Sequence, residues 1–97
     1  MYFMLNSKPK GPTTLGLLKR VLKLLTDPEI KHVSHYGYLN EPGGVHIVEV
    51  DSLEEFRSVL SKFQQTGEVT EVVPLTTHEE TVAGLKVMIK RREEKGK

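Results

Sequence analysis

The 97-residue sequence predicts a domain of the α+β class. Two observations predict this class. Short apolar runs of strand character alternate along the chain with segments whose apolar residues recur every three or four positions, the spacing of an amphipathic helix. Clusters of Pro, Gly, Asn and Thr separate most of these segments, as turns do. A chain this short rarely supports two hydrophobic cores, so we expect a single domain over residues 1–97.

The N-terminal third predicts a strand followed by a helix. Residues 1–7 are expected to form the strand, and the segment KPKGPTT then interrupts the chain. Thr13 or Thr14 is suited to cap the helix that follows, over about residues 14–26. Pro28 and Asp27 end this helix, because the residue before a proline is pushed out of the helical conformation. The residues expected to pack on the sheet are Leu15, Leu18, Val21, Leu22 and Leu25.

A hairpin and a second helix are expected next. The hairpin strands cover about residues 30–39 and 45–50, on either side of the turn NEPGG. Ser52 and Glu55 have the spacing of a capping box at the start of the helix, and Gly67 suits the left-handed position that often follows a helix. The expected buried face of this helix consists of Leu53, Phe56, Leu60 and Phe63.

The C-terminal third predicts a fourth strand and a last helix. Residues 68–75, EVTEVVPL, have strand character, and Pro74 has no amide hydrogen to donate, so this strand is expected at a sheet edge. Thr77 and Glu80 form a second capping box. The helix after it carries one apolar stripe, and residues 93–97 are expected to fray. The stripe consists of Val82, Leu85 and Ile89.

The order β-α-β-β-α-β-α predicts a ferredoxin-like fold, in which helices pack on one face of a four-stranded antiparallel sheet. The strands nevertheless carry apolar residues on both sides, as Phe3 and Leu5 do against Tyr2 and Met4. Strands buried on both faces have this composition. The sequence therefore predicts a homodimer that packs sheet on sheet, with the last helix supporting the partner.

Composition excludes several classes of function. The chain has no cysteine, which excludes a disulfide scaffold, a thiolate metal site and a cysteine nucleophile, and makes the cytoplasm the expected location. Its 14 Lys and Arg against 13 Asp and Glu give a net charge of +1, without the cationic excess of a nucleic-acid-binding protein. The N-terminus has neither the basic region of a signal peptide nor the long apolar run of a membrane span. We therefore expect no nucleic-acid partner and no membrane partner.

Several features together resemble the dimeric α+β barrel superfamily, which includes muconolactone isomerase-like proteins and small cofactor-free monooxygenases. These features are the element order, the glycine-containing hairpin, the transition IVEVDSLEEF over residues 47–56 and the closing segment VTEVVPL. The resemblance implies a homodimer whose two sheets enclose a cavity for a small aromatic or lactone-like molecule, with no cofactor. It assigns no catalytic residue, because the chain carries no catalytic signature of a characterised branch.

The hairpin SHYGYLNEPGGVHIVEV, residues 34–50, carries the candidate ligand-binding side chains. His32 and His35, like His46 and Glu49, have a three-residue spacing that would suit a metal chelate on a helix. Residues three apart on a strand point to opposite faces of a sheet, so we expect no metal site. The candidate ligand-binding residues are His35, His46, Tyr36, Tyr38 and Glu49.

The hairpin turn decides which candidates meet. Pro42 and Gly43 fit the central positions of a type II turn. A loop of two or four residues then places His35 and His46 on one face, with the two tyrosines and Glu49 on the other. A loop of three or five residues instead places His46 with the tyrosines and His35 with Glu49. We favour the first register from loop-length preferences, and the sequence leaves open which face meets the helices.

Three functions are compatible with these residues. The first is a homodimer that binds a small organic ligand in the cavity between the sheets. The second is a cofactor-independent isomerase or monooxygenase acting on a small cyclic substrate near His35, His46 or Tyr36, with His35 and His46 as general acid and base. The third is a ligand-sensing regulatory module. Alternatively, these side chains have only a structural role. The tyrosines would then be partly buried by packing, and His32 and His78 would be exposed.

Overall fold

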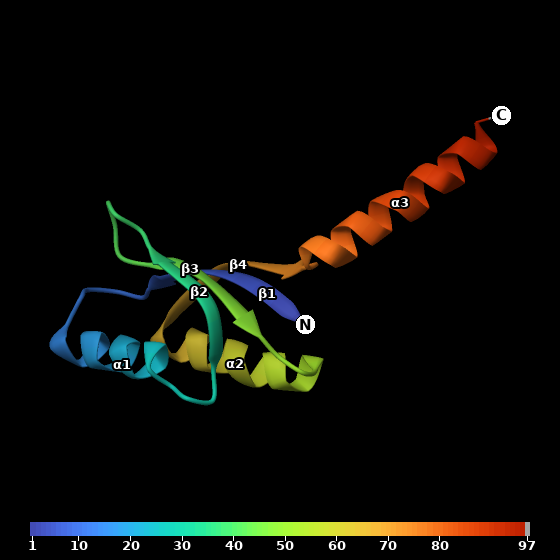
Figure 1. The fold of residues 1–97 in the computed structure, drawn as a ribbon. Helices are drawn as coiled ribbons and strands as arrows, with labels where there is room; N and C mark the ends of the chain where they lie inside the picture. The colour runs from blue at the N-terminus through green and yellow to red at the C-terminus, as the bar shows by residue number, and fades with distance from the viewer. Residues whose placement is uncertain (97) are drawn as a thin grey trace.

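The computed structural model describes residues 1–96 and has the predicted element order. One antiparallel sheet, in the strand order β2-β3-β1-β4, consists of β1 (Tyr2–Pro9), β2 (Lys31–Gly37), β3 (Gly44–Glu49) and β4 (Gly67–Leu75). The helices are α1 (Leu15–Leu25), α2 (Leu53–Thr66) and α3 (His78–Lys95). The predicted α+β, ferredoxin-like fold is thereby confirmed (Figure 1).

The hydrophobic core lies between the sheet and two helices. Helices α1 and α2 cover the same face of the sheet (Figure 1). Alternate residues of the two central strands point toward them, including Leu5 of β1 and Val48 of β3, both fully buried. The rings of Phe3 and Phe56 stack with their centroids 3.9 Å apart, which joins β1 to α2. Phe63 of α2 is also fully buried in this cluster.

The other face, here named the bare sheet face, is covered by no helix among residues 1–96 (Figure 1). Strand register aligns Val73 of β4, Met4 of β1 and Ile47 of β3 in one apolar row across it. The next row contains Glu71, Asn6, Val45 and Tyr36. The two central strands are therefore apolar on both sides, as the sequence predicted.

Helix ends follow the predicted chemistry at two of three sites. Thr14 caps α1 by accepting a hydrogen bond from the Leu17 amide at 3.1 Å, and Thr77 and Glu80 form a complete capping box on α3. At α2 the box is incomplete, because the Glu55 carboxylate accepts from the Asp51 amide and not from Ser52. The acceptor at the helix start is still the Ser52 hydroxyl, so α2 begins where predicted.

Gly67 does not adopt the left-handed conformation predicted for it. Its φ of −169° is extended, and it begins β4 directly after α2. A side chain at this position would collide with the backbone of Lys8 on the neighbouring strand. Gly67 is therefore required by the close approach of two strands and not by a helix-ending turn.

Helix α1 buries a different stripe from the predicted one. Leu17 and Leu24 are buried, with Val21 and Leu25 partly buried beside them. The exposed fractions of three predicted core leucines range from 52% to 69%, so that part of the prediction is wrong; these are Leu15, Leu18 and Leu22. The observed and the predicted buried residues both have helical spacing, and contact with the sheet decides which of them are buried.

Helix α3 projects away from the rest of the chain at the end of β4 (Figure 1). Strand β4 lies at the sheet edge, as Pro74 predicted. No residue of His78–Lys95 is buried, and the Cα radius of gyration of 17.5 Å exceeds the roughly 13 Å of a compact chain of this length. The predicted frayed tail overlaps this helix, which continues to Lys95; residue 97 lies outside the described range.

Candidate functional site

The β2–β3 hairpin brings His35 and His46 together. Strand register places these two residues directly opposite each other and Tyr36 opposite Val45. The amide of Tyr38 donates to the Gly43 carbonyl at 2.9 Å, which closes a four-residue loop over residues 39–42. The favoured division of the residues between the two faces is therefore confirmed, although the loop centre lies two residues before the predicted Pro42-Gly43 pair and the strand pairs are shifted accordingly.

A β-bulge at Val33 places His32 on the same face as His35. The pairing shifts between His32, which lies opposite Val48, and Ser34, which lies opposite Ile47. The extra residue reverses the alternation of side chains. The prediction that the strand separates the two histidines is therefore wrong. The prediction that His32 is exposed is also wrong, because its ring is partly buried 6.1 Å from that of Phe63.

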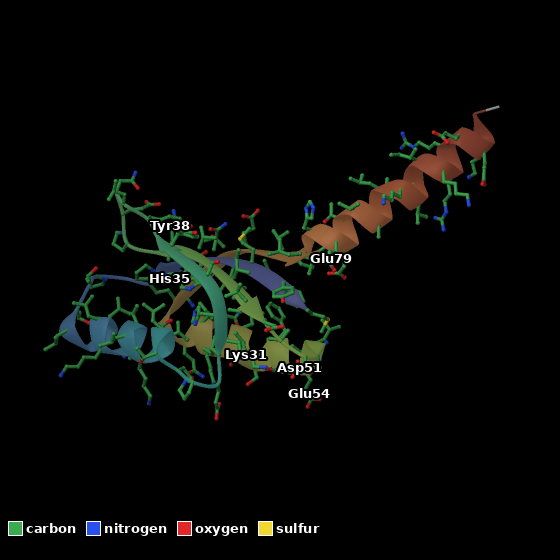
Figure 2. All side chains as sticks on the ribbon, in the orientation of Figure 1. Lys31, His35, Tyr38, Asp51, Glu54 and Glu79 are labelled. Atoms are coloured by element: carbon green, nitrogen blue, oxygen red, sulfur yellow. The ribbon has the colours of Figure 1, made fainter. Side chains whose placement is uncertain are left out.

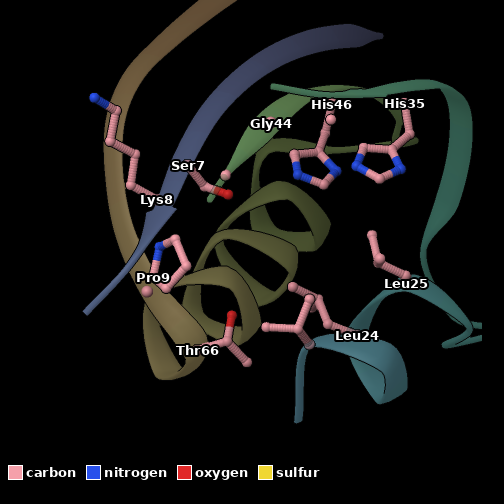
Figure 3. Close-up of a pocket in the computed structure, with 13 residues that line it drawn as sticks. Ser7, Lys8, Pro9, Leu24, Leu25, His35, Gly44, His46 and Thr66 are labelled. Atoms are coloured by element: carbon pink, nitrogen blue, oxygen red, sulfur yellow. The ribbon is translucent and has the colours of Figure 1, made fainter. Parts of the chain in front are cut away.

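Three imidazole rings thus gather between the sheet and the helices. The rings of His35 and His46 stack with their centroids 4.4 Å apart and their planes 11° apart. The ring centroids of His32 and His46 lie 5.5 Å apart, and those of Phe63 and His46 lie 4.8 Å apart with their planes at 74°. Figure 3 shows His35 and His46 side by side, directed toward Leu24 and Leu25 of α1. His78, in contrast, is exposed as predicted.

His46 is uncharged at neutral pH. It is 4% exposed, and burial, followed by the neighbouring His35 and His32, lowers its pKa to about 4. Burial and then His35 also lower the pKa of His32. Within residues 1–96, Nδ1 of His46 and Nε2 of His32 are buried without a hydrogen-bond partner. His46 therefore offers an unpaired ring nitrogen and not a positive charge.

A cavity of about 170 Å³, here named the histidine pocket, lies beneath the stacked rings of His35 and His46 (Figure 3). Helix α1 contributes an aliphatic wall of Val21, Leu24 and Leu25. The opposite side of the pocket is formed by Pro9 of β1 and by Thr66, which lies at the junction of α2 with β4. The pocket is therefore mostly apolar, with polar groups at the histidines and, on the opposite side, at Ser7, Lys8 and Thr66.

Two glycines on the hairpin shape this pocket differently. A Cβ at Gly44 would lie 2.7 Å from the Tyr36 carbonyl oxygen and 3.2 Å from Nε2 of His35. A Cβ at Gly37 would meet only the Gly43 carbonyl oxygen, at an ordinary 3.9 Å, and would point to the same face as His35. Position 44 therefore requires glycine, whereas position 37 has space for a methyl group.

Lys8 is the only charged residue among the described residues that line the pocket. Its Nζ lies 3.1 Å from Oε1 of Glu41, and this hydrogen bond raises the pKa of Lys8 above its ordinary value. The lysine is therefore already paired with Glu41 at the solvent edge of the pocket. Across residues 1–96, no group of three or more His, Cys, Asp or Glu side chains is arranged to hold a metal ion.

The family model of DUF3303, a domain of unknown function, matches residues 1–89. The chain belongs to the DUF3303 family. The match includes the whole sheet, α1, α2 and α3 as far as Ile89, so the histidine pocket and the bare sheet face both lie within the DUF3303 domain. None of the curated proteins matches the chain. No helix in the described part of this DUF3303 chain has the length and apolar character needed to cross a membrane.

The other candidate residues lie on the opposite face of the DUF3303 sheet. Tyr36 and Glu49 share the bare sheet face with Tyr38, as the favoured register predicted. The Tyr38 hydroxyl donates to Oδ1 of Asn6 at 2.8 Å, and Nδ2 of Asn6 donates to Oε1 of Glu71 at 2.6 Å. In Figure 2, Tyr38 lies on the far side of the sheet from α1, and His35 lies between the sheet and α1. The five predicted residues therefore form two groups, and ligand binding by either stays a prediction.

Proposed function

We propose that this DUF3303 protein binds a small, uncharged organic molecule of about one ring in the histidine pocket. The observation that carries the proposal is His46, which lines the cavity, is 4% exposed and has an Nδ1 atom without a hydrogen-bond partner in the described chain. A buried polar atom left unpaired costs about 1–3 kcal/mol. The atom is itself buried, so a pocket ligand reaches it when the His46 ring turns, and a hydrogen bond formed there offsets that cost.

The size and wall of the pocket favour a single apolar ring. A dry apolar cavity of about 150 Å³ accommodates benzene, and the histidine pocket measures about 170 Å³. Val21, Leu24 and Leu25 offer aliphatic contacts to a ring face. The resemblance to the dimeric α+β barrel superfamily supports the same ligand class but implies a cavity between two sheets. The proposed pocket lies beneath α1 instead.

The charge of the pocket favours an uncharged ligand. A carboxylate or phosphate that entered would lose its hydration without gaining a free cation, because Lys8 is paired with Glu41. A hydroxyl group suits His46 in either tautomer, since a hydroxyl both donates and accepts hydrogen bonds. A single-ring compound with one hydroxyl group is therefore the best probe, and phenol is the simplest example.

The low pKa of His46 favours binding over acid–base catalysis. A general base works best when its pKa is close to the operating pH, and a pKa of about 4 makes His46 a weak base at neutral pH. We therefore assign a binding role to His46 and not the role of general base in an isomerase or monooxygenase. Because the sequence has no cysteine, we place this function in the cytoplasm.

Calorimetric titration with phenol tests the proposal, with Gly37→Ala and Gly84→Ala as matched variants. We expect the wild-type protein to bind phenol with a dissociation constant of about 0.1–1 mM, within the range for so small a ligand. Gly37→Ala adds a methyl group on the pocket side and should weaken binding at least about tenfold. Gly84→Ala makes the same change in open space on α3 and should leave binding unchanged.

Comparison of phenol with one further ligand, toluene, tests the role of His46. Toluene has the same ring without the hydroxyl, and we expect it to bind about tenfold more weakly than phenol to the wild-type protein. His46→Phe should abolish that difference. If the variant retains the preference for phenol, His46 does not contact the hydroxyl group. Failure of both compounds to bind the wild-type protein would reject the pocket as a ligand site.

A further inference from the structure

We propose that α3 docks on the bare sheet face of a second copy of this chain, and that the two copies exchange their α3 helices reciprocally. This inference concerns a surface on the other side of the sheet from the histidine pocket and does not depend on ligand binding. It rests on α3, on the junction that directs it, and on the bare sheet face.

Helix α3 leaves an apolar stripe in solvent. Val82, Leu85, Met88 and Ile89 lie on one side of the helix, and their exposed fractions range from 36% to 56%. Gly84 interrupts the helix interior, with no atom within 4 Å of where its Cβ would be, and glycine weakens a helix. Isolated helices gain little stability in water, so an 18-residue helix of this composition needs a surface to pack on.

The junction between β4 and α3 directs the helix away from its own sheet. Thr77 and Glu80 form the capping box, and the Thr81 hydroxyl donates to the Thr77 carbonyl at 2.8 Å. The hydroxyl groups of Thr76 and Thr81 also lie 2.6 Å apart. Only Thr76 and Thr77 connect β4 to α3, which leaves little chain for the helix to turn back over the bare sheet face of its own molecule. The surface that covers the stripe is therefore on another molecule.

The bare sheet face matches the α3 stripe in spacing. Its central row of Val73, Met4 and Ile47 comes from three neighbouring strands, which lie about 4.8 Å apart. Apolar residues on one side of a helix repeat at about 5.4 Å, one helical turn. At 18 residues, α3 is about 27 Å long, enough to extend across four strands.

The charged residues near the α3 stripe favour docking on the bare sheet face over docking on the exposed leucines of α1. Lys86 flanks the α3 stripe and Arg92 continues it toward the C-terminus. The bare sheet face carries the carboxylate of Glu71, and Glu49 on the same face lies opposite Lys31. Opposite charges therefore meet at the edges of the proposed contact. The charged residues of α1 are all basic, namely Lys19, Arg20 and Lys23, so α3 would meet like charges there.

Direct contact between two bare sheet faces fits these observations less well. A twofold interface between these faces would bury the Glu71 carboxylate and its hydrogen bond to Asn6, and buried charges without opposite partners are costly. It would also leave the α3 stripe exposed. Reciprocal exchange covers both apolar surfaces of both copies in one contact.

Cysteine cross-linking of the full chain tests the contact, because the natural sequence has no cysteine. We expect an equimolar mixture of Leu85→Cys and Val73→Cys proteins to form a disulfide-linked heterodimer on mild oxidation. Val87→Cys is the matched control, because Val87 is exposed on the opposite side of α3, and it should not link to Val73→Cys. Efficient linkage of Val73→Cys to itself, or of Leu85→Cys to Leu18→Cys, would overturn the proposal.

Sedimentation equilibrium supplies a second readout. The wild-type chain should be a dimer at micromolar concentration. Leu85→Glu should raise the dimer dissociation constant at least about 30-fold, as expected for a central interface residue, and Val87→Glu by less than about threefold. Circular dichroism and urea unfolding establish that both variants fold. A monomeric wild-type protein, or equal effects of the two substitutions, would contradict docking through the stripe.

Discussion

His46 should make the folding free energy of the protein depend on pH. Its pKa is about 4 in the folded chain and near its ordinary value of 6.5 in the unfolded chain, so between these values the unfolded state binds more protons. The stability is therefore complete above about pH 6.5 and decreases as the pH falls toward 4. We expect urea unfolding to show a loss of about 2 kcal/mol between pH 7 and pH 5 from this group.

The matched variants for this prediction are His46→Phe and His78→Phe. The first removes the titrating group and should flatten most of the pH dependence, leaving the smaller contribution of His32 in the same direction. The second changes an exposed histidine and should keep the wild-type profile. An unchanged pH profile in His46→Phe would assign the titration to another group.

At the same scale, the sequence predicts some residue contacts and misses others for a physical reason. Loop-length preferences place His35 and His46 on one face correctly, because an even loop length sets which residues share a face. The bulge that adds His32 to this pair has no Gly or Pro to mark it, since Val33 is an ordinary strand residue. Asn6 and Glu71 meet across 65 positions of sequence, and only the completed sheet brings them together.

At the scale of elements, local chemistry predicts where helices and strands begin better than which side they bury. Thr14 and Thr77 cap their helices as predicted, because capping involves neighbouring residues. Helix α1 has leucines on two adjacent sides, and spacing alone does not distinguish Leu17 and Leu24 from Leu18 and Leu22. Which side is buried depends on how α1 packs against the sheet, and the residues of the helix alone do not determine that contact.

Two paired glycines on β2 and β3, Gly37 and Gly44, should respond differently to substitution by alanine. Gly44→Ala should destabilise the protein by about 1–3 kcal/mol, because the new methyl group would lie 2.7 Å from the Tyr36 carbonyl oxygen and force the strands apart. Gly37→Ala, on the paired position of the other strand, should be neutral or stabilising by up to about 1 kcal/mol. Urea unfolding at neutral pH measures both, and equal losses would show that the strands are not this close in solution.

At the scale of the whole molecule, the element order predicts the fold but not the position of α3. Right-handed crossovers leave few arrangements for β-α-β-β-α-β, so the sheet and its two packed helices follow from sequence. No such rule places a helix that follows the last strand. Its apolar stripe is visible in the sequence, and the structure adds that no residue of α3, all of which is described, is buried.

If α3 is covered by a second copy, the stability of the protein should depend on its concentration. Unfolding then also separates the dimer, so each tenfold rise in protein concentration should add about 1.4 kcal/mol to the free energy of unfolding per dimer. We expect the urea midpoint of the wild-type chain to rise between about 1 and 100 µM. Val87→Glu should keep this dependence, whereas Leu85→Glu should lose it and unfold at one midpoint. A wild-type midpoint that stays constant over this range would show that α3 remains uncovered in solution.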